Sequence, residues 1–142
     1  MTDDIVDSPV AWVAEHIRRY ADTDGRDGGE LHGNDILLLT TRGRRTGTRR
    51  RTALIYGRDG DRHLLVASDG GSPRHPAWYL NLAADPAVEL QVGADRFAGT
   101  ARTASGAERD RLWRLMAERF PRYDAYQEVA GREIPLVVVE RA

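Results

Sequence analysis

The chain has 142 residues, enough for one domain with a substantial core. Apolar residues make up 41% and charged residues 30%, the proportions of a soluble globular protein. There is no cysteine and no lysine, because all 21 basic residues are arginine. This composition excludes disulfides, thiol catalysis, Cys-ligated zinc, Schiff-base chemistry and the lysine of a Walker P-loop.

The N-terminal part predicts a helix and a loop. Residues 1–4 are acidic, and no apolar run is long enough for a signal peptide or a membrane span, so we expect a cytoplasmic protein. Ser8-Pro9 before apolar residues at helical spacing predicts a helix over about residues 9–21. We favour packing of this helix on the domain; the alternative is a peripheral membrane contact aided by Arg18 and Arg19. The glycine-rich stretch 22–34 predicts a flexible loop, which sets residues 1–34 apart from a main domain at 35–142.

The main domain predicts mostly strands. Apolar runs and turn signals indicate about six of them, over residues 35–41, 51–57, 62–68, 87–92, 96–103 and 134–140. The first of these predicts a strand that is buried on both faces. A helix begins near Pro76, and the capping-box pattern from Ser105 to Glu108 begins another that continues to Arg119. These elements indicate a mainly β, α+β protein: a small six-stranded antiparallel barrel with about three flanking helices.

The turn between the first two of these strands concentrates positive charge. Six of the ten residues from Arg42 to Arg51 are arginine. The whole chain carries a net charge of −1 and this segment +6, so the other residues sum to −7. Because guanidinium groups match carboxylate and phosphate oxygens, the pattern indicates a bound anion rather than a solvated basic tip. Nucleic acid, a nucleotide and an acidic cofactor all remain open.

A second candidate region runs through residues 67–82, where a strand meets a glycine turn, a proline and a helix. A turn that feeds a helix N-terminus offers free amides to an anion or a polarised carbonyl. Ser68 and the turn are therefore candidate ligand contacts, with Trp78 and Tyr79 as flat surfaces beside them. Further along, Tyr123 and Tyr126 are three residues apart and share one side of a helical turn.

Acid–base machinery is not evident in the sequence. It contains no G-x-G-x-x-G, H-E-x-x-H or G-x-S-x-G motif, and its four histidines lack metal-ligand spacing, so we expect no metal site. No nucleophile–base pair stands out. A ligand cradle without such groups is typical of a protein that takes its chemistry from a cofactor.

The chain resembles the deazaflavin (F420)-dependent nitroreductase family of split β-barrel oxidoreductases over about residues 37–140. The likeness is carried by four blocks, Leu37–Gly47, Ala67–Leu82, Tyr123–Gln127 and Arg132–Pro135. It implies an FMN-binding split-barrel-like fold, with a homodimer as a common assembly, and the cofactor F420, a deazaflavin with a phosphate and an oligoglutamate tail. It also implies hydride transfer from the reduced deazaflavin to a quinone or another activated enone, with nitroaromatics as incidental acceptors.

The resemblance also implies roles for individual residues. The hairpin would hold the phosphate or the tail through Arg44, Arg45, Thr46, Gly47 and Arg50. The pocket of the deazaflavin ring would be shaped by Ser68, Gly70, Gly71, Pro76, Trp78 and Tyr79. The catalytic candidates are Ser68, Tyr123 and Tyr126, of which Tyr126 would hydrogen-bond or protonate the acceptor oxygen.

The sequence departs from the family pattern at four positions. Asp69 stands where the family has a lysine, which removes a positive contact with the tail. Ala53 replaces a proline, with a small expected effect on stability. Ile55 and Phe120 replace tyrosines of the nitro-drug-activating member, which argues against nitroimidazoles as good substrates.

Other functions remain open beside this one. An FMN-dependent split-barrel reductase would use the same barrel, although the short phosphate tail of FMN needs less positive charge. A non-catalytic protein could carry the deazaflavin or bind another polyanion. Nucleic acid is not expected, because few aromatic residues accompany the arginines and the rest of the chain is acidic.

Overall fold

The structure is a computed structural model that describes residues 5–31 and 33–142, so the acidic start and His32 lie outside it. The strands are β1 (Ile5–Asp7), β2 (Glu30–Leu31), β3 (Asn34–Arg42), β4 (Arg49–Ile55), β5 (Gly57–Asp59), β6 (Arg62–Val66), β7 (Ala87–Val92), β8 (Asp95–Thr103) and β9 (Leu136–Arg141). The helices are α1 (Ala11–Thr23), α2 (Ala77–Ala84), α3 (Gly106–Arg119) and α4 (Arg122–Ala130), and a 3₁₀ turn, η1, spans Asp69–Gly71.

One sheet contains all nine strands, in the order β1-β4-β3-β7-β8-β9-β6-β5, with β2 paired to β3. The prediction of an α+β protein is confirmed, with one large sheet and four helices in the described residues, but the prediction of six antiparallel strands is wrong. β1 pairs with β4 in parallel. The strand predicted over 51–57 ends at Ile55, and a new strand begins at Gly57. The two strands missed entirely, β1 and β2, have three and two residues, too few to show an alternating pattern.

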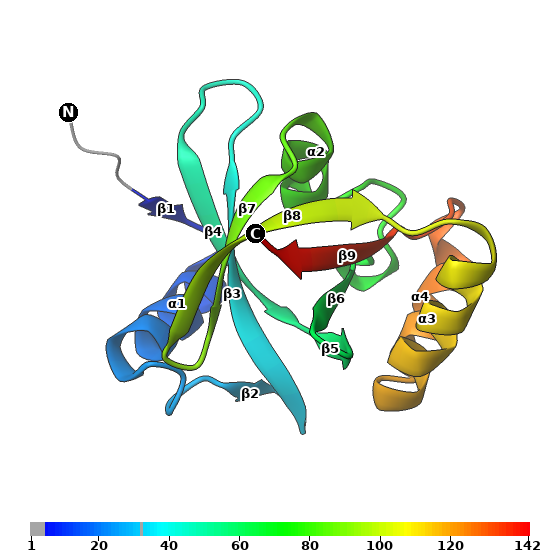
Figure 1. Cartoon of the computed structure of the whole chain (residues 1–142), viewed down its shortest axis with the longest axis horizontal. Coiled ribbons are helices and arrows are strands. Elements are labelled where there is room, and N and C mark those ends of the chain that lie inside the picture. Colours follow the sequence, from blue (N-terminus) through cyan, green and yellow to red (C-terminus); the bar gives the residue numbers. More distant parts are fainter. Residues whose placement is uncertain (1–4, 32) are drawn as a thin grey trace.

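The path of strand pairing is open, yet the chain holds its two ends together. β4 and β5 lie near opposite ends of the strand order, and only Tyr56 separates them in the sequence. Because neighbouring Cα atoms are about 3.8 Å apart, the Cα atoms of Ile55 and Gly57 can be at most about 7.6 Å apart. The sheet must therefore curl until its ends approach each other, as the ribbon shows (Figure 1).

Side-chain alternation divides the core into three apolar clusters. Leu37 and Leu39 of β3 face the interior of the curled sheet, whereas Ile36 and Leu38 face α1. This confirms that β3 is buried on both faces. On the other side, α3 and α4 lie together and cover β6 and β9 (Figure 1), where Leu136 joins their cluster. Several elements therefore meet near residues 52–55 of β4 and the end of β6, with α1 on one side and α4 on the other.

The helices differ from the prediction in number and in one detail. There are four within the described residues rather than three, because the turn that carries Tyr123 and Tyr126 continues as α4. Ser105 is the N-cap of α3, as predicted, but its side chain makes no capping hydrogen bond. Glu108 binds Arg102 and Arg62 instead. None of these helices is long and apolar enough to cross a membrane.

Candidate functional site

A cavity of about 570 Å³ lies where the two ends of the curled sheet approach each other. Its walls come from the N-terminal segment and α1, from residues 52–55 of β4, from the turn after β6 and from the start of α4. β1 covers β4 only at residues 49–51, so the 52–55 edge has no neighbouring strand on that side among the described strands. This arrangement gives a mostly apolar, partly enclosed site at a sheet edge.

Six of the residues expected around the ring and the acceptor line this cavity: Ser68, Gly70, Pro76, Trp78, Tyr123 and Tyr126. Ser68 and Tyr123 are buried, while Tyr126 is half-buried. Burial, together with the neighbouring Tyr126, raises the pKa of Tyr123 above its usual value, so its hydroxyl stays protonated at neutral pH. The cavity therefore combines flat aromatic walls with a few hydroxyl groups, the usual make-up of a small-molecule site.

All four positions where the chain departs from the family pattern border this cavity. They are Ala53, Ile55, Asp69 and Phe120. Ile55 and Phe120 make this part of the wall less polar than two tyrosines would. Asp69 instead brings a carboxylate to the turn after β6.

A second, smaller cavity of about 190 Å³ continues the first towards the arginine hairpin. The two share Ser8, Thr52 and Trp78. The smaller cavity is bordered by Arg50 and by Asn81, whose side-chain oxygen accepts hydrogen bonds from the Arg44 backbone amide (3.2 Å) and guanidinium (2.9 Å). A continuous path thus leads from the aromatic walls to the base of the hairpin.

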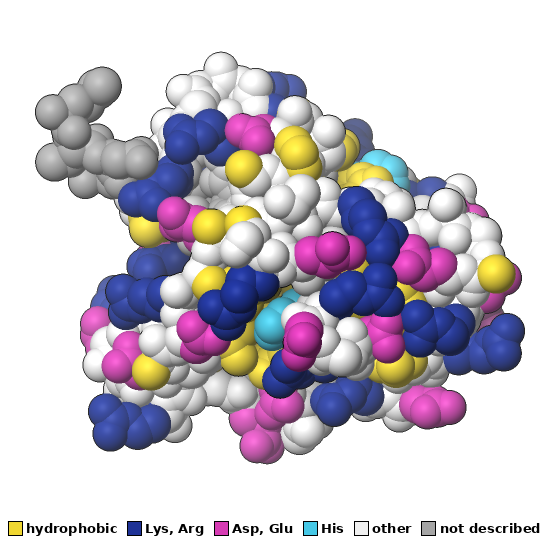
Figure 2. Space-filling model, in the orientation of Figure 1, with side chains coloured by type: hydrophobic (Ala, Val, Ile, Leu, Met, Phe, Trp, Pro, Cys, Tyr) yellow, Lys and Arg dark blue, Asp and Glu magenta, His cyan; other side chains and the backbone are white. Residues whose placement is uncertain are grey.

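Within the hairpin, the expected residues divide into two groups. The Thr46 hydroxyl donates to the Thr48 hydroxyl at 3.0 Å, and the Gly47 amide donates to the Gly43 carbonyl at 2.8 Å, so both shape the turn. The side chains of Arg45 and Arg50, by contrast, have no hydrogen-bond or ion-pair partner in the described part of the chain. Figure 2 shows basic side chains on the side of the molecule where β1 and β4 lie, as well as over the rest of this face. These two guanidinium groups are free to meet an anion.

Two of the residues expected around the deazaflavin ring lie outside both cavities. A Cβ at Gly71 would come within 2.9 Å of Val129 and 3.2 Å of the Tyr126 backbone, so this glycine lets α4 approach the turn closely. Tyr79 directs its hydroxyl at Thr103, 2.9 Å away, and its ring contacts His75. Gly71 thus affects the cavity through the packing of α4, whereas the Tyr79 hydroxyl is bound to the end of β8.

Sequence reasoning missed several residues of the site. Ser8, Val10, Trp12, Val13 and His16 line the larger cavity, although they precede the predicted domain. Trp12 is 64% exposed, and a tryptophan on the polar side of a predicted helix was the available signal. Asn81 and Arg132 carried no signal beyond their place in the family blocks. Within the described residues, no three His, Cys, Asp or Glu side chains gather as a metal site.

Comparison with known proteins decides the family. The model of the F420H(2)-dependent quinone reductase family matches residues 12–141. The chain belongs to this family. An F420H(2)-dependent quinone reductase of Mycobacterium tuberculosis is 45% identical over 130 residues, which cover 89% of this chain and 87% of that protein.

Solved structures agree with this family assignment. An F420-H2 dependent reductase, FDR-A, is 40% identical with a TM-score of 0.69, covering 74% of this chain and 93% of its own. A domain-swapped dimer is 38% identical with a TM-score of 0.72, covering 94% of this chain and all of its own. The family predicted from the four sequence blocks is thereby confirmed, and this F420H(2)-dependent quinone reductase family member shares its fold with a solved F420-H2 dependent reductase.

Proposed function

We propose that this protein is an F420-dependent reductase that transfers a hydride from the reduced deazaflavin to a quinone. One observation carries the proposal: an aromatic cavity with two tyrosines connects through a second cavity to Arg50, a hairpin arginine whose side chain has no partner among the described residues. A flat ring joined to a polyanionic tail matches this arrangement, with the ring in the aromatic cavity and the tail towards the hairpin. Family membership supports the same cofactor and the same class of acceptor.

The residues present fit the cofactor. The larger cavity lies within the range of about 300–1,000 Å³ that is typical of small-molecule sites. Trp78 borders both cavities, so it would lie beside the ring and near the start of the tail. Arg45 and Arg50 would bind the phosphate or carboxylates of the tail, with Arg44 held at the base of the hairpin by Asn81. FMN, with its single phosphate, would leave much of this charge unused.

When bound, reduced F420 supplies the hydride, and the protein supplies position and a hydrogen-bond donor. Reduction of a quinone to a hydroquinone consumes one hydride and one proton. The Tyr126 hydroxyl, which borders the cavity, would donate to the acceptor oxygen as negative charge develops there. Tyr123, kept neutral by burial, and Ser68 would be further donors to the ring or the acceptor. The apolar Ile55 and Phe120 favour a quinone over a nitroimidazole.

The proposal extends to the architecture and the assembly. The single-residue link at Tyr56 supports describing the curled open sheet as a split β-barrel. A homodimer is consistent with the relative that was solved as a domain-swapped dimer. Size-exclusion chromatography with light scattering distinguishes a monomer from a dimer of this chain.

The test of the cofactor is a fluorescence titration of the purified protein with F420 and, separately, with FMN. Binding of F420 without FMN supports the proposal. Binding of FMN alone would replace it with the flavin alternative, and failure of both would remove the oxidoreductase function.

The test of the tyrosine is Tyr126→Phe. We expect kcat for quinone reduction to fall about 100-fold, the lower end of what a positioned acid contributes, while the Kd for F420 changes little. Stopped-flow absorbance of the reduced cofactor measures the first, and fluorescence the second. Tyr56→Phe, which removes a hydroxyl outside the cavity, is the control. An unchanged kcat in Tyr126→Phe would exclude the proposed role.

A further inference from the structure

Arg132, in the loop between α4 and β9, is bound to the segment that joins β6 to α2. Its guanidinium donates hydrogen bonds to three backbone carbonyls, those of Ala67 (3.2 Å), Ser68 (3.1 Å) and Ser72 (3.0 Å). A fourth contact joins it to Nδ1 of His75 at 3.1 Å. One side chain thus holds both ends of the turn that borders the larger cavity.

That turn has a backbone that needs external support. Asp69, Gly70 and Gly71 have consecutive positive φ angles of 46°, 64° and 85°. Asp69 is not a glycine, and such conformations persist only where the surrounding structure determines them. Ser68 precedes them with φ −79° and ψ −36°, in the right-handed region. A right-handed residue followed by left-handed ones is the backbone pattern of an anion-binding nest, in which successive amides form a concavity.

The amides of this nest are available. Within the described residues, the backbone N–H groups of Ser68, Asp69 and Gly70 have no hydrogen-bond partner, and all three residues border the cavity. The next two amides are used inside the turn, because Gly71 donates to Ser68 (2.9 Å) and Ser72 to Asp69 (3.1 Å). The free donors are therefore on the part of the turn that a ligand can reach.

Arg132 also polarises these N–H donors electrostatically. The carbonyl of Ala67 belongs to the same peptide unit as the Ser68 N–H, and the carbonyl of Ser68 to the same unit as the Asp69 N–H. A cation bonded to the oxygen of a peptide unit draws electron density from its nitrogen, and such chains of hydrogen bonds strengthen one another. Two of the three free amides thus belong to peptide units that the guanidinium polarises.

We propose that Arg132 is a positioning residue that holds and polarises the Ser68–Gly70 amides for an electron-rich or anionic oxygen of the bound cofactor ring. This inference rests on the proposed function for the identity of the ligand. It predicts that Arg132 affects cofactor binding and the local order of the turn, and leaves the acceptor-facing tyrosines in place.

The four contacts of the Arg132 guanidinium with the turn form a clamp, and the contact with His75 reports whether this clamp is present. Guanidinium is only a donor, so Nδ1 of His75 must accept, and the ring is the neutral tautomer with its proton on Nε2. Burial, followed by the charge of Arg132, lowers the pKa of His75. Removing the guanidinium should therefore raise this pKa, which an NMR titration of the ring measures without any cofactor.

The experiment compares Arg132→Ala and Arg132→Lys with Arg74→Ala, which removes an exposed arginine near the same turn. We expect Arg132→Ala to raise the Kd for F420 by about tenfold or more, as for the loss of hydrogen bonds from a charged group, with KM for the quinone little changed. Arg132→Lys should recover part of the affinity, since one ammonium keeps the charge without the fork. Added guanidinium ion should partly restore binding to Arg132→Ala.

Hydrogen exchange separates the clamp from the proposed function. In the free Arg132→Ala protein, the amides of Gly71 and Ser72 should exchange faster while the β3 and β9 amides are unaffected. If the wild-type protein does not bind F420, the proposed function fails, yet this local change still supports the clamp. Unchanged exchange at Gly71 and Ser72, or an equal increase in every element, would overturn it whatever the cofactor result.

Discussion

Two arginine-rich regions of the molecule differ in what the arginines meet. At the α3 end, an acid-paired cluster is formed by Arg62, Arg102 and Arg111 around Asp59 and Glu108. Arg102 binds Glu108 at 2.6 Å, Arg111 binds Asp59 at 3.0 Å, and Arg62 binds both acids. Every guanidinium in this cluster has a carboxylate of the same chain.

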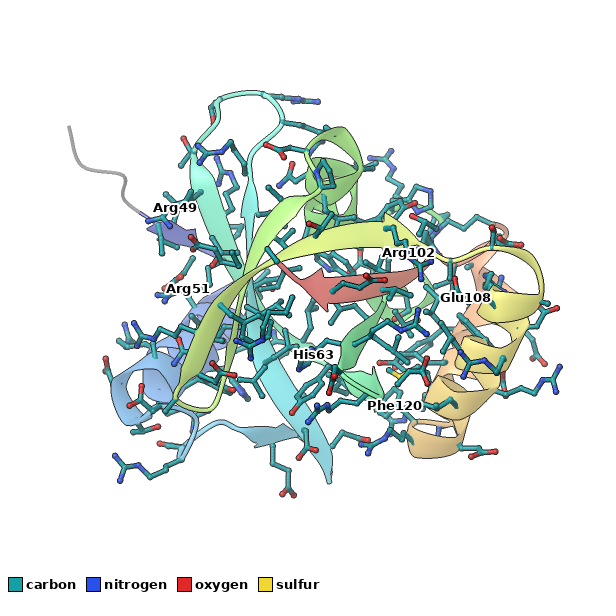
Figure 3. The ribbon with its side chains drawn as sticks, in the orientation of Figure 1. Arg49, Arg51, His63, Arg102, Glu108 and Phe120 are labelled. Atoms are coloured by element: carbon teal, nitrogen blue, oxygen red, sulfur yellow. The ribbon has the colours of Figure 1, made fainter. Side chains whose placement is uncertain are left out.

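The hairpin between β3 and β4 contrasts with that cluster. Its flanking arginines are paired, Arg49 with Glu89 and Arg51 with Asp7, but Arg45 and Arg50 have no partner in the described part of the chain. Figure 3 shows the two regions at opposite sides of the sheet, with Arg49 and Arg51 beside β1 and with Arg102 and Glu108 where β8 meets α3. Partners, rather than residue type, separate arginines that stabilise the fold from arginines that can bind a ligand.

The largest expected effect comes from the unpaired arginines. We expect Arg45→Ala combined with Arg50→Ala to weaken F420 binding about 100-fold or more, because a hydrogen bond from a charged group contributes about 1.5–3 kcal/mol. The melting temperature should hardly change. Fluorescence titration and thermal denaturation measure the two quantities. Arg102→Ala is the matched control, with normal affinity and lower stability; equal affinity losses in both proteins would erase the distinction between the regions.

Acid should affect the paired cluster first. Hydrogen bonds from Arg111 and then Arg62 lower the pKa of Asp59 to about 2, and those from Arg102 and then Arg62 lower that of Glu108 to about 2. Because these folded-state values lie below the unfolded ones, the stabilisation is complete above about pH 5 and is lost as the pH falls towards about 2.

Asp59→Asn tests this dependence. We expect it to lower the melting temperature by about 2–4 °C at pH 7 and to reduce the further loss on acidification, because the group that titrates is gone. Calorimetry between neutral and acid pH measures both. F420 affinity should stay that of the wild type. If the melting temperature of Asp59→Asn falls with pH as steeply as that of the wild type, Asp59 does not contribute to the acid dependence of stability.

The smallest expected effect concerns an acid at the other region. The carboxylate of Asp69 borders the larger cavity and pairs with no arginine among the described residues. Asp69→Asn removes its charge and keeps a residue that tolerates a positive φ. We expect F420 to bind about two- to threefold more tightly, as for one weakened, solvent-screened repulsion. Asp61→Asn, in the β5–β6 turn, is the control and should leave the Kd unchanged; weaker binding in Asp69→Asn would mean that this carboxylate helps the ligand.

Much of the fold could be predicted from the sequence because its main strands are long apolar runs. β3 shows its burial on both faces in consecutive leucines, and β7 and β8 lie within a residue of the predicted bounds. The break between β4 and β5 at Tyr56 could not be predicted, since a single residue does not interrupt the pattern of strand-forming residues. β1 depends on a parallel pairing with a strand more than forty residues away, for which three residues carry no local signal.

The candidate site divides in the same way. The blocks that resemble the family contain Ser68, Trp78 and Tyr126, and the structure brings these three to one cavity. The wall contributed by Val10 and Trp12 could not be predicted, because it depends on where α1 docks. Nor could the hydrogen bonds of Arg132, since an arginine in a loop has the same sequence appearance whether it faces water or three carbonyls.

The one-residue connection at Tyr56 also constrains how the protein can move. At that point the two ends of the sheet cannot part by more than the span of two peptide units, so the sheet cannot widen evenly like a ring. Any opening of the curled sheet must therefore be a rotation about this junction, in which the parts far from Tyr56 move most. Residues 54 and 55 border the larger cavity directly beside this junction, and α1 packs against Ile55, whereas α4 packs against α3 and the turn after β6. The cavity wall formed by β4 and α1 is consequently the stiffer one, and the α4 side is where a bulky acceptor would find room.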